Sequence, residues 1–529
     1  MIFVWKVTMK PISATGALAL TTVLSSASTP IWAQAPSPAK ITIDATQRRA
    51  ISPYVYGVNF PEWDKLGFRV PLARQGGNRL SAYNWETNAS NAGSDWHHQN
   101  DAFMAPTDEP GYVGRTFVED ARKHGAAMIL TVPMTGHVAA DKGPGGDVNQ
   151  TPNYLETRFN RSLPHKPGPF VYPPDTKDHV VYQDEYVAWI EKIKGPGTTV
   201  WYALDNEPDI WSGTHARIVP KTPTYAEFIQ RSIEYAAAIK AVAPRAKIAG
   251  PVSYGWQGFR RFQNASDANN RDFLDVYLSA MQAEGQRRGK RLLDLLDIHF
   301  YPEARGDGVR VTEESPKPGT AAARIQAPRS LWDPTYVEDS WITQSMGGKP
   351  IALLPGIQKQ IATHYPGTKL AVTEYNYGGR KDISGAIAQA DVLGIYGRNG
   401  VYAACIWGMS PADSGPVAGF RAFLNYDGRG SQFGDLGLAV RGESSADDSV
   451  YAALDSRRPG RLTAVLINKT AQSRPMQLTI KGFAARRAAG YAVTQSSLTA
   501  PQPLAAAVGG GHVSVTAPPL SVVTLEVSR

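Results

Sequence analysis

The chain has 529 residues, of which 42 % are hydrophobic and 19 % charged, so it is long enough for two globular modules and too apolar to be disordered. Its formal net charge of +8 comes from scattered Lys and Arg without a dense basic run, which argues against nucleic-acid binding. Cys405 is the single cysteine of the chain, so no internal disulfide can form, and its apolar neighbours predict a packing residue rather than a nucleophile.

The first 35 residues have the features of an export signal. Lys6 and Lys10 precede a short apolar stretch, and Ala33-Gln-Ala35 is a small-x-small cleavage motif. The apolar stretch is too short and too polar to span a membrane stably. We therefore predict a signal peptide over residues 1–35 and a protein secreted to the periplasm or the outside, free of the membrane after cleavage. An uncleaved anchor is the alternative.

Strand and helix patterns alternate through the middle of the chain and predict an α/β fold. A short alternating strand near residue 41 comes first, within residues 36–52. Eight apolar runs follow, at residues 54–60, 72–80, 126–134, 199–205, 246–254, 293–301, 370–377 and 401–409. These runs lack clean alternation, as strands buried on both faces do. Helical patterns lie between most of them, at residues 112–123, 184–192, 224–243, 272–288 and 383–398. We predict a (β/α)8 TIM barrel over residues 53–430.

The pattern changes near residue 430. Short strands at regular spacing are predicted at residues 451–455, 462–468, 476–481, 489–493, 512–517 and 521–527. We read residues 431–529 as an all-β sandwich, which the lone N-terminal strand joins before the chain enters the barrel.

Three long loops follow predicted barrel strands, at residues 83–110, 136–174 and 303–348. Loops after strands lie on the carboxyl-terminal face of such a barrel, where active sites form. Loops of this length are more often substrate walls than accidents. We therefore expect them to border the site.

Two buried runs end in carboxylates. Glu207 follows Ala203-Leu-Asp-Asn206, and Glu374 follows Leu370-Ala-Val-Thr373. Buried acids without partners are costly and rare, which weighs against ordinary surface acids at both places. A pair of carboxylates is the minimum that glycosidic-bond cleavage requires, one to hold a proton and one to attack the sugar carbon.

The chain resembles glycoside hydrolase family 44, a group of exported bacterial endo-β-1,4-glucanases and xyloglucanases. The segments that carry the resemblance run from about residue 51 to residue 461. They are Ile51-Ser-Pro-Tyr-Val-Tyr-Gly-Val-Asn-Phe60, Gly76-Gly-Asn78, Tyr83-Asn-Trp85, Gly93-Ser-Asp-Trp96, Asp205-Asn-Glu-Pro-Asp-Ile-Trp211, Thr373-Glu-Tyr-Asn-Tyr-Gly378 and Phe423-Leu-Asn-Tyr-Asp-Gly428. Asn-Glu-Pro alone is shared by many barrel glycosidases, whereas the combination is specific.

The resemblance implies a barrel with a β-sandwich and a retaining mechanism. It makes Glu207 the acid/base and Glu374 the nucleophile, at the ends of the fourth and seventh strands. In a retaining site the two carboxyl groups lie about 5–5.5 Å apart. The charge of Glu374 should then raise the pKa of Glu207 and keep it protonated near neutral pH.

Further site residues follow from their positions. Asn206 is expected at the sugar 2-hydroxyl, Tyr301 at the nucleophile, and Arg74 and Asn78 as bridges across the site. Barrel packing is the alternative for Tyr301, and His299 is equally a core histidine or a site residue. Trp407 is expected to lie beneath the reactive sugar and stack against it. The candidate platforms for other sugars, each with core packing as the alternative, are Trp85, Trp96, Trp211, Trp332 and Tyr377.

No cofactor is expected for catalysis, but the resemblance implies a structural calcium ion. Calcium takes oxygen ligands, and Glu62, Asp141 and Asp147 lie on loops after the first and third strands. Their spacing fits no EF-hand, and solvated loop acids are the alternative.

The expected activity is internal cleavage of β-1,4-glucan backbones in a plant cell-wall-type polysaccharide, by a monomer. Cellulose-type glucan, mixed-linkage glucan and xyloglucan all remain open. The alternatives are another barrel glycosidase (a xylanase, mannanase or arabinofuranosidase) and a polysaccharide-binding protein without catalysis.

Overall fold

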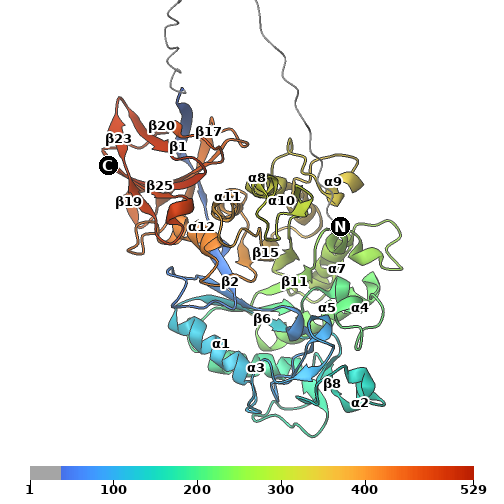
Figure 1. The fold of residues 1–529 in the computed structure, drawn as a ribbon. Coiled ribbons are helices and arrows are strands. Elements are labelled where there is room, and N and C mark those ends of the chain that lie inside the picture. Colours follow the sequence, from blue (N-terminus) through green and yellow to red (C-terminus); the bar gives the residue numbers. More distant parts are fainter. Residues whose placement is uncertain (1–36) are drawn as a thin grey trace, which may run out of the picture. The chain divides into compact units, whose positions relative to one another are not determined.

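A computed structural model describes residues 37–529 (Figure 1). The predicted signal peptide lies outside these residues. Among the helices of residues 37–529, none combines the length and the hydropathy that crossing a bilayer requires.

Within the described residues, eight parallel strands close into a barrel, which confirms the predicted fold class. Each strand coincides with one of the predicted apolar runs, with only β15 beginning one residue before its run. In order around the barrel they are β2 (Gly57–Asn59), β3 (Leu72–Gln75), β6 (Ala127–Val132), β10 (Val200–Leu204), β11 (Ile248–Ser253), β12 (Leu295–His299), β15 (Lys369–Tyr375) and β16 (Ala403–Ile406). Parallel pairing brings the carboxyl ends of all eight strands to one face.

The helices between the strands include all five that the sequence predicts. These are α1 (Tyr112–Lys123), α3 (Gln183–Ile193), α5 (Tyr225–Val242), α7 (Phe273–Arg287) and α11 (Ile383–Arg398). The start of α5 is fixed by a capping box, in which Glu227 N donates to Thr224 Oγ1 at 3.1 Å and Thr224 N donates to Glu227 Oε2 at 2.8 Å. Two further long helices are α10 (Leu353–His364) and α12 (Ser414–Leu424).

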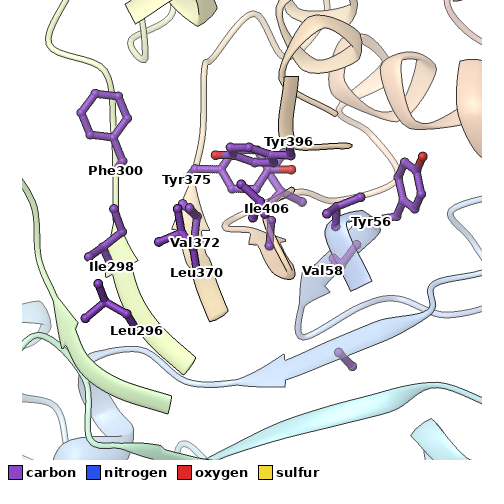
Figure 2. Close-up of a cluster of buried hydrophobic side chains, with 14 of the residues drawn as sticks. Tyr56, Val58, Leu296, Ile298, Phe300, Leu370, Val372, Tyr375, Tyr396 and Ile406 are labelled. Carbon is purple, nitrogen blue, oxygen red and sulfur yellow. The ribbon is translucent and has the colours of Figure 1, made fainter. Parts of the chain in front are cut away.

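The larger part of the core lies between the outward side chains of the barrel strands and the helices that surround them. Figure 2 shows those of β12, β15, β16 and β2, together with Tyr396 from α11. The inward side chains at the base of the barrel are mostly small or aliphatic, among them Ala203, Leu295, Ala371 and Ala403. Cys405 is buried with them, and burial raises the pKa of its thiol. These side chains fill the barrel interior at its base. The polar side chains of the interior lie nearer the carboxyl-terminal face.

A β-bulge interrupts the pairing of β12 with β15. Ile298 lies opposite Val372, but the next residue, His299, lies opposite Glu374, so Thr373 is an extra residue on β15. Such a bulge re-aims side chains that strict alternation would send to opposite faces. Thr373 and Glu374 consequently both make contacts inside the barrel.

The three predicted long loops carry short elements of their own. They hold β4 (Ser90–Asn91) and β5 (Asn100–Asp101), then β7 (His137–Ala139), α2 (Tyr154–Thr157) and β8 (Phe159–Leu163), and last β13 (Arg305–Gly306), β14 (Val309–Arg310), α8 (Pro318–Gln326) and α9 (Trp341–Ser345). β9 (Val180–Tyr182) follows the second of these loops and pairs with β8. Shorter loops carry α4 (Trp211–Thr214) and α6 (Trp256–Arg261).

The second module is built on one sheet of ten strands in the described residues. Its order is β22 (Gln502–Leu504), β21 (Arg487–Val493), β25 (Ser521–Ser528), β19 (Arg458–Asn468), β18 (Asp448–Asp455), β17 (Leu436–Arg441), β1 (Ala39–Ala50), β20 (Arg474–Lys481), β24 (His512–Ala517) and β23 (Ala506–Gly509). The sheet folds over, so that β21 contacts β23 and β24 around a common apolar core. β1, longer than the predicted strand, pairs with β17 and β20.

Helix α11 joins the two modules. Nearly all its residues are buried, and it packs against α12 as well as β18, β19 and β25. At this contact Asp391 forms an ion pair of 2.8 Å with Lys469, and both side chains are only 1 % exposed. Tyr451 donates a hydrogen bond to Asp391 Oδ1 at 2.6 Å. The interface therefore contains a buried polar contact.

Candidate active site

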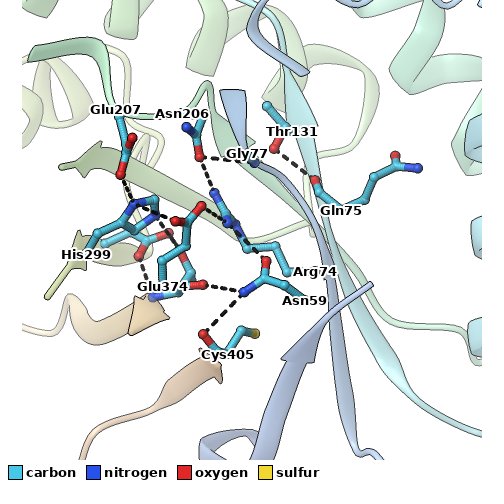
Figure 3. Close-up of polar contacts among 12 residues, drawn as sticks. Asn59, Arg74, Gln75, Gly77, Thr131, Asn206, Glu207, His299, Glu374 and Cys405 are labelled. Carbon is cyan, nitrogen blue, oxygen red and sulfur yellow. Dashed lines mark hydrogen bonds and ion pairs between the residues drawn. The ribbon is translucent and has the colours of Figure 1, made fainter. Parts of the chain in front are cut away.

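Glu207 and Glu374 meet at the carboxyl-terminal face of the barrel (Figure 3). Glu207 follows β10, and its φ of 47° places it in the left-handed region, which a residue with a side chain adopts only when its surroundings hold it. Those surroundings include Glu207 N, which donates to Val252 O at 2.9 Å. The buried Asp205 carboxylate accepts hydrogen bonds from Ser81 Oγ, Met134 N and Asn206 N.

The two carboxylates share their site with His299 of β12. One oxygen of each carboxylate and His299 Nδ1 all lie within 4.8 Å of one another. His299 Nδ1 is 2.8 Å from Glu207 Oε1 and 3.6 Å from Glu374 Oε2. Such spacing would also suit a metal ion, but an arginine already supplies the positive charge at Glu374. The arrangement is therefore suited to proton transfer and nucleophilic attack.

That arginine is Arg74, the penultimate residue of β3, which is fully buried. Its Nη1 donates to Glu374 Oε1 at 2.8 Å and to Asn59 Oδ1 at 3.0 Å, and its Nη2 donates to Asn206 Oδ1 at 2.8 Å. A planar guanidinium serves three acceptors at once with fixed geometry. It thus bridges Glu374 and Asn206, as expected for Arg74.

Asn206 is oriented by two donors. Its Oδ1 accepts from Arg74 Nη2 and, at 3.1 Å, from Gly77 N. Because both neighbours are donors, the amide oxygen must face them, and the NH2 group is left to point elsewhere. This leaves a hydrogen-bond donor beside Glu207 for a substrate hydroxyl.

Tyr301 lies just beyond β12 and donates its hydroxyl to Glu374 Oε2 at 2.9 Å. The two Glu374 oxygens therefore each accept one hydrogen bond, from Arg74 and from Tyr301. Burial raises the pKa of Glu374, but these two donors oppose the shift. Glu374 is accordingly the carboxylate that stays ionised.

Among the described residues, Glu207 does not have a matching pair of hydrogen-bond donors to oppose the upward shift of its pKa. Burial, and then the negative charge of Glu374, raises the pKa of Glu207 well above its usual value. The pKa of His299 is lowered well below its usual value by burial and by the Arg74 cation, so this imidazole is neutral. The two carboxylates thus differ in environment, with the proton held on Glu207.

Asn59, at the end of β2, is a site residue that the sequence predictions did not single out. Its side-chain amide donates to the main-chain oxygens of Thr373, Cys405 and Ile406 at 2.9–3.2 Å, while its oxygen accepts from Arg74. It ties β2 to β15 and β16 directly beside Glu374. Its place at a strand end is the signal that could have found it.

Three of the expected sugar platforms are buried and cannot touch a polymer. Trp85 is 1 % exposed and stacks on Tyr186 and Trp189, and Tyr377 is 2 % exposed. Trp211 is fully buried and donates its indole N–H to Asn206 O at 3.0 Å. The core-packing alternative holds for all three, although Trp211 still acts on the site by positioning Asn206.

The remaining expected residues are more accessible. Trp407 follows β16 and borders a cavity of about 630 Å³, which is also lined by Asn78, Phe60 and Phe103. Asn78 donates to Ala92 O at 3.3 Å and does not contact Arg74.

Two other expected platforms lie apart from this cavity. Trp96 is 57 % exposed, and Trp332 is only partly buried, against the core.

The cleft has aromatic walls that the predictions missed. Phe60 and Phe103, which line the cavity beside Trp407, are 41 % and 72 % exposed. On the side of Tyr301, a second cavity of about 200 Å³ is lined by Tyr254, Trp256 and Trp341. Exposed aromatic rings are suited to the apolar faces of sugars, and exposure cannot be read from residue type.

The three acids predicted to hold calcium do not fit a shared site. Glu62 pairs with Lys65, Asp141 with Arg158 and Asp147 with Arg217, at 3.0, 2.7 and 2.6 Å. In the described residues these acids do not form a cluster of metal-ligand spacing. The structural calcium ion itself stays a prediction, which the effect of a chelator on the melting temperature would test.

Comparison with known proteins identifies the family. The family model for glycoside hydrolase family 44 matches residues 89–304. Endoglucanase A of Paenibacillus lautus is 38 % identical over 500 residues, which are 90 % of this chain and 70 % of that protein. Beta-mannanase/endoglucanase A of Caldicellulosiruptor saccharolyticus is 39 % identical over 461 residues, 81 % of this chain but 34 % of the relative.

Among solved structures, a Paenibacillus polymyxa xyloglucanase from the same family, in complex with xyloglucan, superposes with a TM-score of 0.87. It is 36 % identical, and the alignment covers 93 % of this chain and 99 % of that one. Sequence identity at this level over nearly the whole chain, together with the shared fold, shows that the chain is a glycoside hydrolase and belongs to glycoside hydrolase family 44.

Proposed function

We propose that the chain cleaves β-1,4-glucan backbones internally, with retention of configuration and without a cofactor. The observation that carries this proposal is the short distance between two carboxylates in unlike environments. Oxygens of Glu207 and Glu374 lie within 4.8 Å, which fits the separation of about 5–5.5 Å in retaining enzymes and not the 6.5–9.5 Å of inverting ones.

The reaction proceeds in two displacements. Glu374 attacks the anomeric carbon while Glu207 donates its proton to the leaving oxygen, so the glycosidic bond breaks and a glycosyl ester forms on Glu374. Glu207, now ionised, takes a proton from water, and the resulting hydroxide displaces Glu374. Arg74 and Tyr301 stabilise Glu374 each time it regains its charge.

Internal cleavage is supported by space on both sides of the carboxylates. The larger cavity begins at Gly77 and Trp407, and the smaller one at Tyr301. A chain that extends both ways from the site is cut internally, whereas a pocket closed at one end releases terminal sugars. The relatives named endoglucanase and xyloglucanase support β-1,4-glucan as the backbone.

The first experiment assigns the two carboxylates. On 2,4-dinitrophenyl β-cellobioside, whose leaving group needs no acid, Glu207→Ala should be rescued by azide and give the β-glycosyl azide. Glu374→Ala should be rescued to the α-glycosyl azide, because azide then replaces the nucleophile. The exposed Glu62→Gln serves as the control. Swapped anomers would reverse the two roles, and hydrolysis with inversion by the wild type would refute retention.

A second experiment assigns the polymer. Barley β-glucan, carboxymethyl-cellulose and xyloglucan should lose viscosity faster than reducing ends accumulate, as internal cutting requires. Arabinoxylan and mannan form the comparison arms. Faster cleavage of either would replace β-glucan as the preferred backbone, and release of single terminal sugars would contradict internal cleavage.

We also propose that the enzyme acts outside the cytoplasm as a monomer. Its polymeric substrate cannot cross a membrane, and the signal-like features of residues 1–35 support export. Cell fractionation and light scattering of the purified protein test the two statements.

A further inference from the structure

A chain of fully buried side chains runs beneath the catalytic pair. Asp297 of β12 accepts from Thr373 N at 3.2 Å through Oδ1, and from Thr373 Oγ1 at 2.9 Å through Oδ2. Thr373 Oγ1 lies 3.3 Å from His299 Nε2, and His299 Nδ1 lies 2.8 Å from Glu207 Oε1. Asp297, Thr373 and His299 are each 0 % exposed.

The hydrogens along this chain follow from counting donors. A threonine hydroxyl has one hydrogen, and an ionised Asp297 accepts it. Burial raises the pKa of Asp297 to about 7, whereas the Arg74 cation and the two hydrogen bonds from Thr373 favour the carboxylate, so the carboxylate is the form present above that pH. Only its lone pairs then face His299, so Nε2 must carry the hydrogen in order to bond. A neutral imidazole with its hydrogen on Nε2 has a bare Nδ1. The 2.8 Å contact with Glu207 is therefore a hydrogen bond only if Glu207 carries the proton.

The charged surroundings of His299 agree with a neutral ring. Arg74 approaches from β3, and Glu207 and Glu374 approach from the ends of β10 and β15. Asp297 lies two residues away on the same strand, and Tyr301 lies two residues beyond. The fully buried position disfavours an imidazolium, and the Arg74 cation disfavours it further.

We propose that Asp297 and Thr373 are positioning residues that hold His299 in its Nε2–H tautomer, so that Nδ1 accepts the proton of Glu207 and the acid form is favoured. The inference rests on the proposed function only in calling Glu207 the acid/base. The bulge in β15 makes the arrangement possible, because Thr373 is the extra residue that faces the barrel interior below Glu374.

Asp297→Asn tests the chain sharply, because the structure dictates how the new amide would sit. Thr373 N–H requires an acceptor at the Oδ1 position, so the amide oxygen would take that place. The NH2 group would then face Thr373 Oγ1 and donate to it. The threonine would turn its hydrogen to His299 Nε2, and the ring would move to the Nδ1–H tautomer. That tautomer donates to ionised Glu207 and lowers its pKa.

The first readout is the pH profile of kcat/KM on soluble β-glucan. Asp297→Asn and Thr373→Val should move the alkaline limb to lower pH by about one unit, the effect of about one hydrogen bond to an ionised group. Thr373→Ser keeps the hydroxyl and should keep the wild-type limb. Thr373→Val leaves the charge of Asp297 in place, which separates tautomer control from a through-space charge effect. Melting temperatures verify that each variant is folded.

The second readout is independent of activity. In protein labelled with 15N-histidine, long-range couplings distinguish Nε2–H from Nδ1–H, and His299→Gln assigns the signal among the 10 histidines. The wild type and Thr373→Ser should show Nε2–H, whereas Asp297→Asn should show Nδ1–H. A wild-type tautomer in Asp297→Asn, or a wild-type alkaline limb in Thr373→Val, would overturn the proposal. A failed azide rescue would instead refute the proposed function and leave the tautomer result standing.

Discussion

At the residue scale, the geometry of the site depends on how many hydrogen bonds one side chain, that of Arg74, donates. Arg74 has three acceptors on three strands or strand ends, and it lies where no water can replace it. Buried charges of this kind are stable only when they are paired and hydrogen-bonded. The orientation of both Asn206 and Glu374 therefore depends on the shape of one guanidinium as well as on its charge.

We expect Arg74→Lys to lower kcat/KM by about 100-fold or more. A lysine keeps the charge but cannot span Glu374 and Asn206 together, and each lost charge-assisted bond costs about 1.5–3 kcal/mol, where 1.36 kcal/mol is tenfold in rate. Steady-state kinetics measures the loss. Arg115→Lys is the matched control, because Arg115 is only half-buried and pairs with Glu119 on α1 and with Glu109 on the loop before it. An Arg74→Lys enzyme within a fewfold of wild type would mean that charge alone suffices.

A second prediction concerns Asp209, which is fully buried and accepts from Tyr254 N at 3.0 Å. Burial raises its pKa to about 7, above the 3.8 of the free side chain. A raised carboxylate pKa stabilises the fold while the group is protonated, and this contribution is lost as pH rises from about 4 to about 7. The full loss is on the order of 4 kcal/mol, since one pKa unit corresponds to 1.36 kcal/mol.

Asp209→Asn cannot ionise, so its free energy of unfolding should fall less than that of the wild type between pH 4.5 and pH 8. Urea unfolding at several pH values measures both curves. Parallel curves would show that Asp209 does not titrate in this range.

At the element scale, turns at strand ends set how closely the walls of the site approach. Gly77 follows β3 with a φ of 89°, and a Cβ atom there would lie 2.3 Å from Trp407 Cη2. Its N–H also holds Asn206. A glycine is therefore required for two reasons, the left-handed backbone and the contact with the indole.

Gly77→Ala should displace Trp407 and reduce kcat/KM by about 100-fold, because a shift of about 1 Å in a positioning group has that effect. Gly136→Ala is a matched control, since its φ of 92° is similar but the space around it is open. Equal losses in the two variants would point to backbone strain rather than to the indole contact.

At the scale of the whole molecule, the barrel and the sandwich share helix α11. The residues from Pro38 to Arg529 form one compact unit, and the Lys469–Asp391 ion pair lies inside it. Removing one partner of a buried ion pair leaves an uncompensated charge, which costs about 3–5 kcal/mol. The two modules are thus coupled energetically.

We expect calorimetry of the wild type to show one cooperative unfolding transition. Lys469→Met should lower the midpoint temperature of this transition, which should remain a single transition. The double variant Lys469→Met with Asp391→Asn should recover part of the loss, because the buried charge is gone. Lys359→Met, on the exposed face of α10, should have little effect. Two separate transitions in the wild type would contradict the coupling.

The barrel could be predicted because eight apolar runs and five helical patterns alternate in the sequence. Glu207 and Glu374 could be predicted from their motifs at strand ends. The burial of individual aromatic side chains could not be predicted. Trp211 and Tyr377 were therefore expected as sugar platforms although they are core residues, and the exposed Phe103 was missed. Asp297 and Thr373 were missed for another reason. Their contact depends on an irregular register between two strands, which has no periodic signature.

The irregular register has a consequence for how this enzyme can change. Substitutions vary one position at a time, but the loss of a single codon at Thr373 would restore plain alternation along β15. Val372 faces the helices, so Glu374 would follow it directly and would still face the barrel interior opposite His299. The hydroxyl between Asp297 and His299 would be lost, while Glu374 would keep its place. A shortened strand would therefore retain the carboxylate and lose only the control of the imidazole hydrogen.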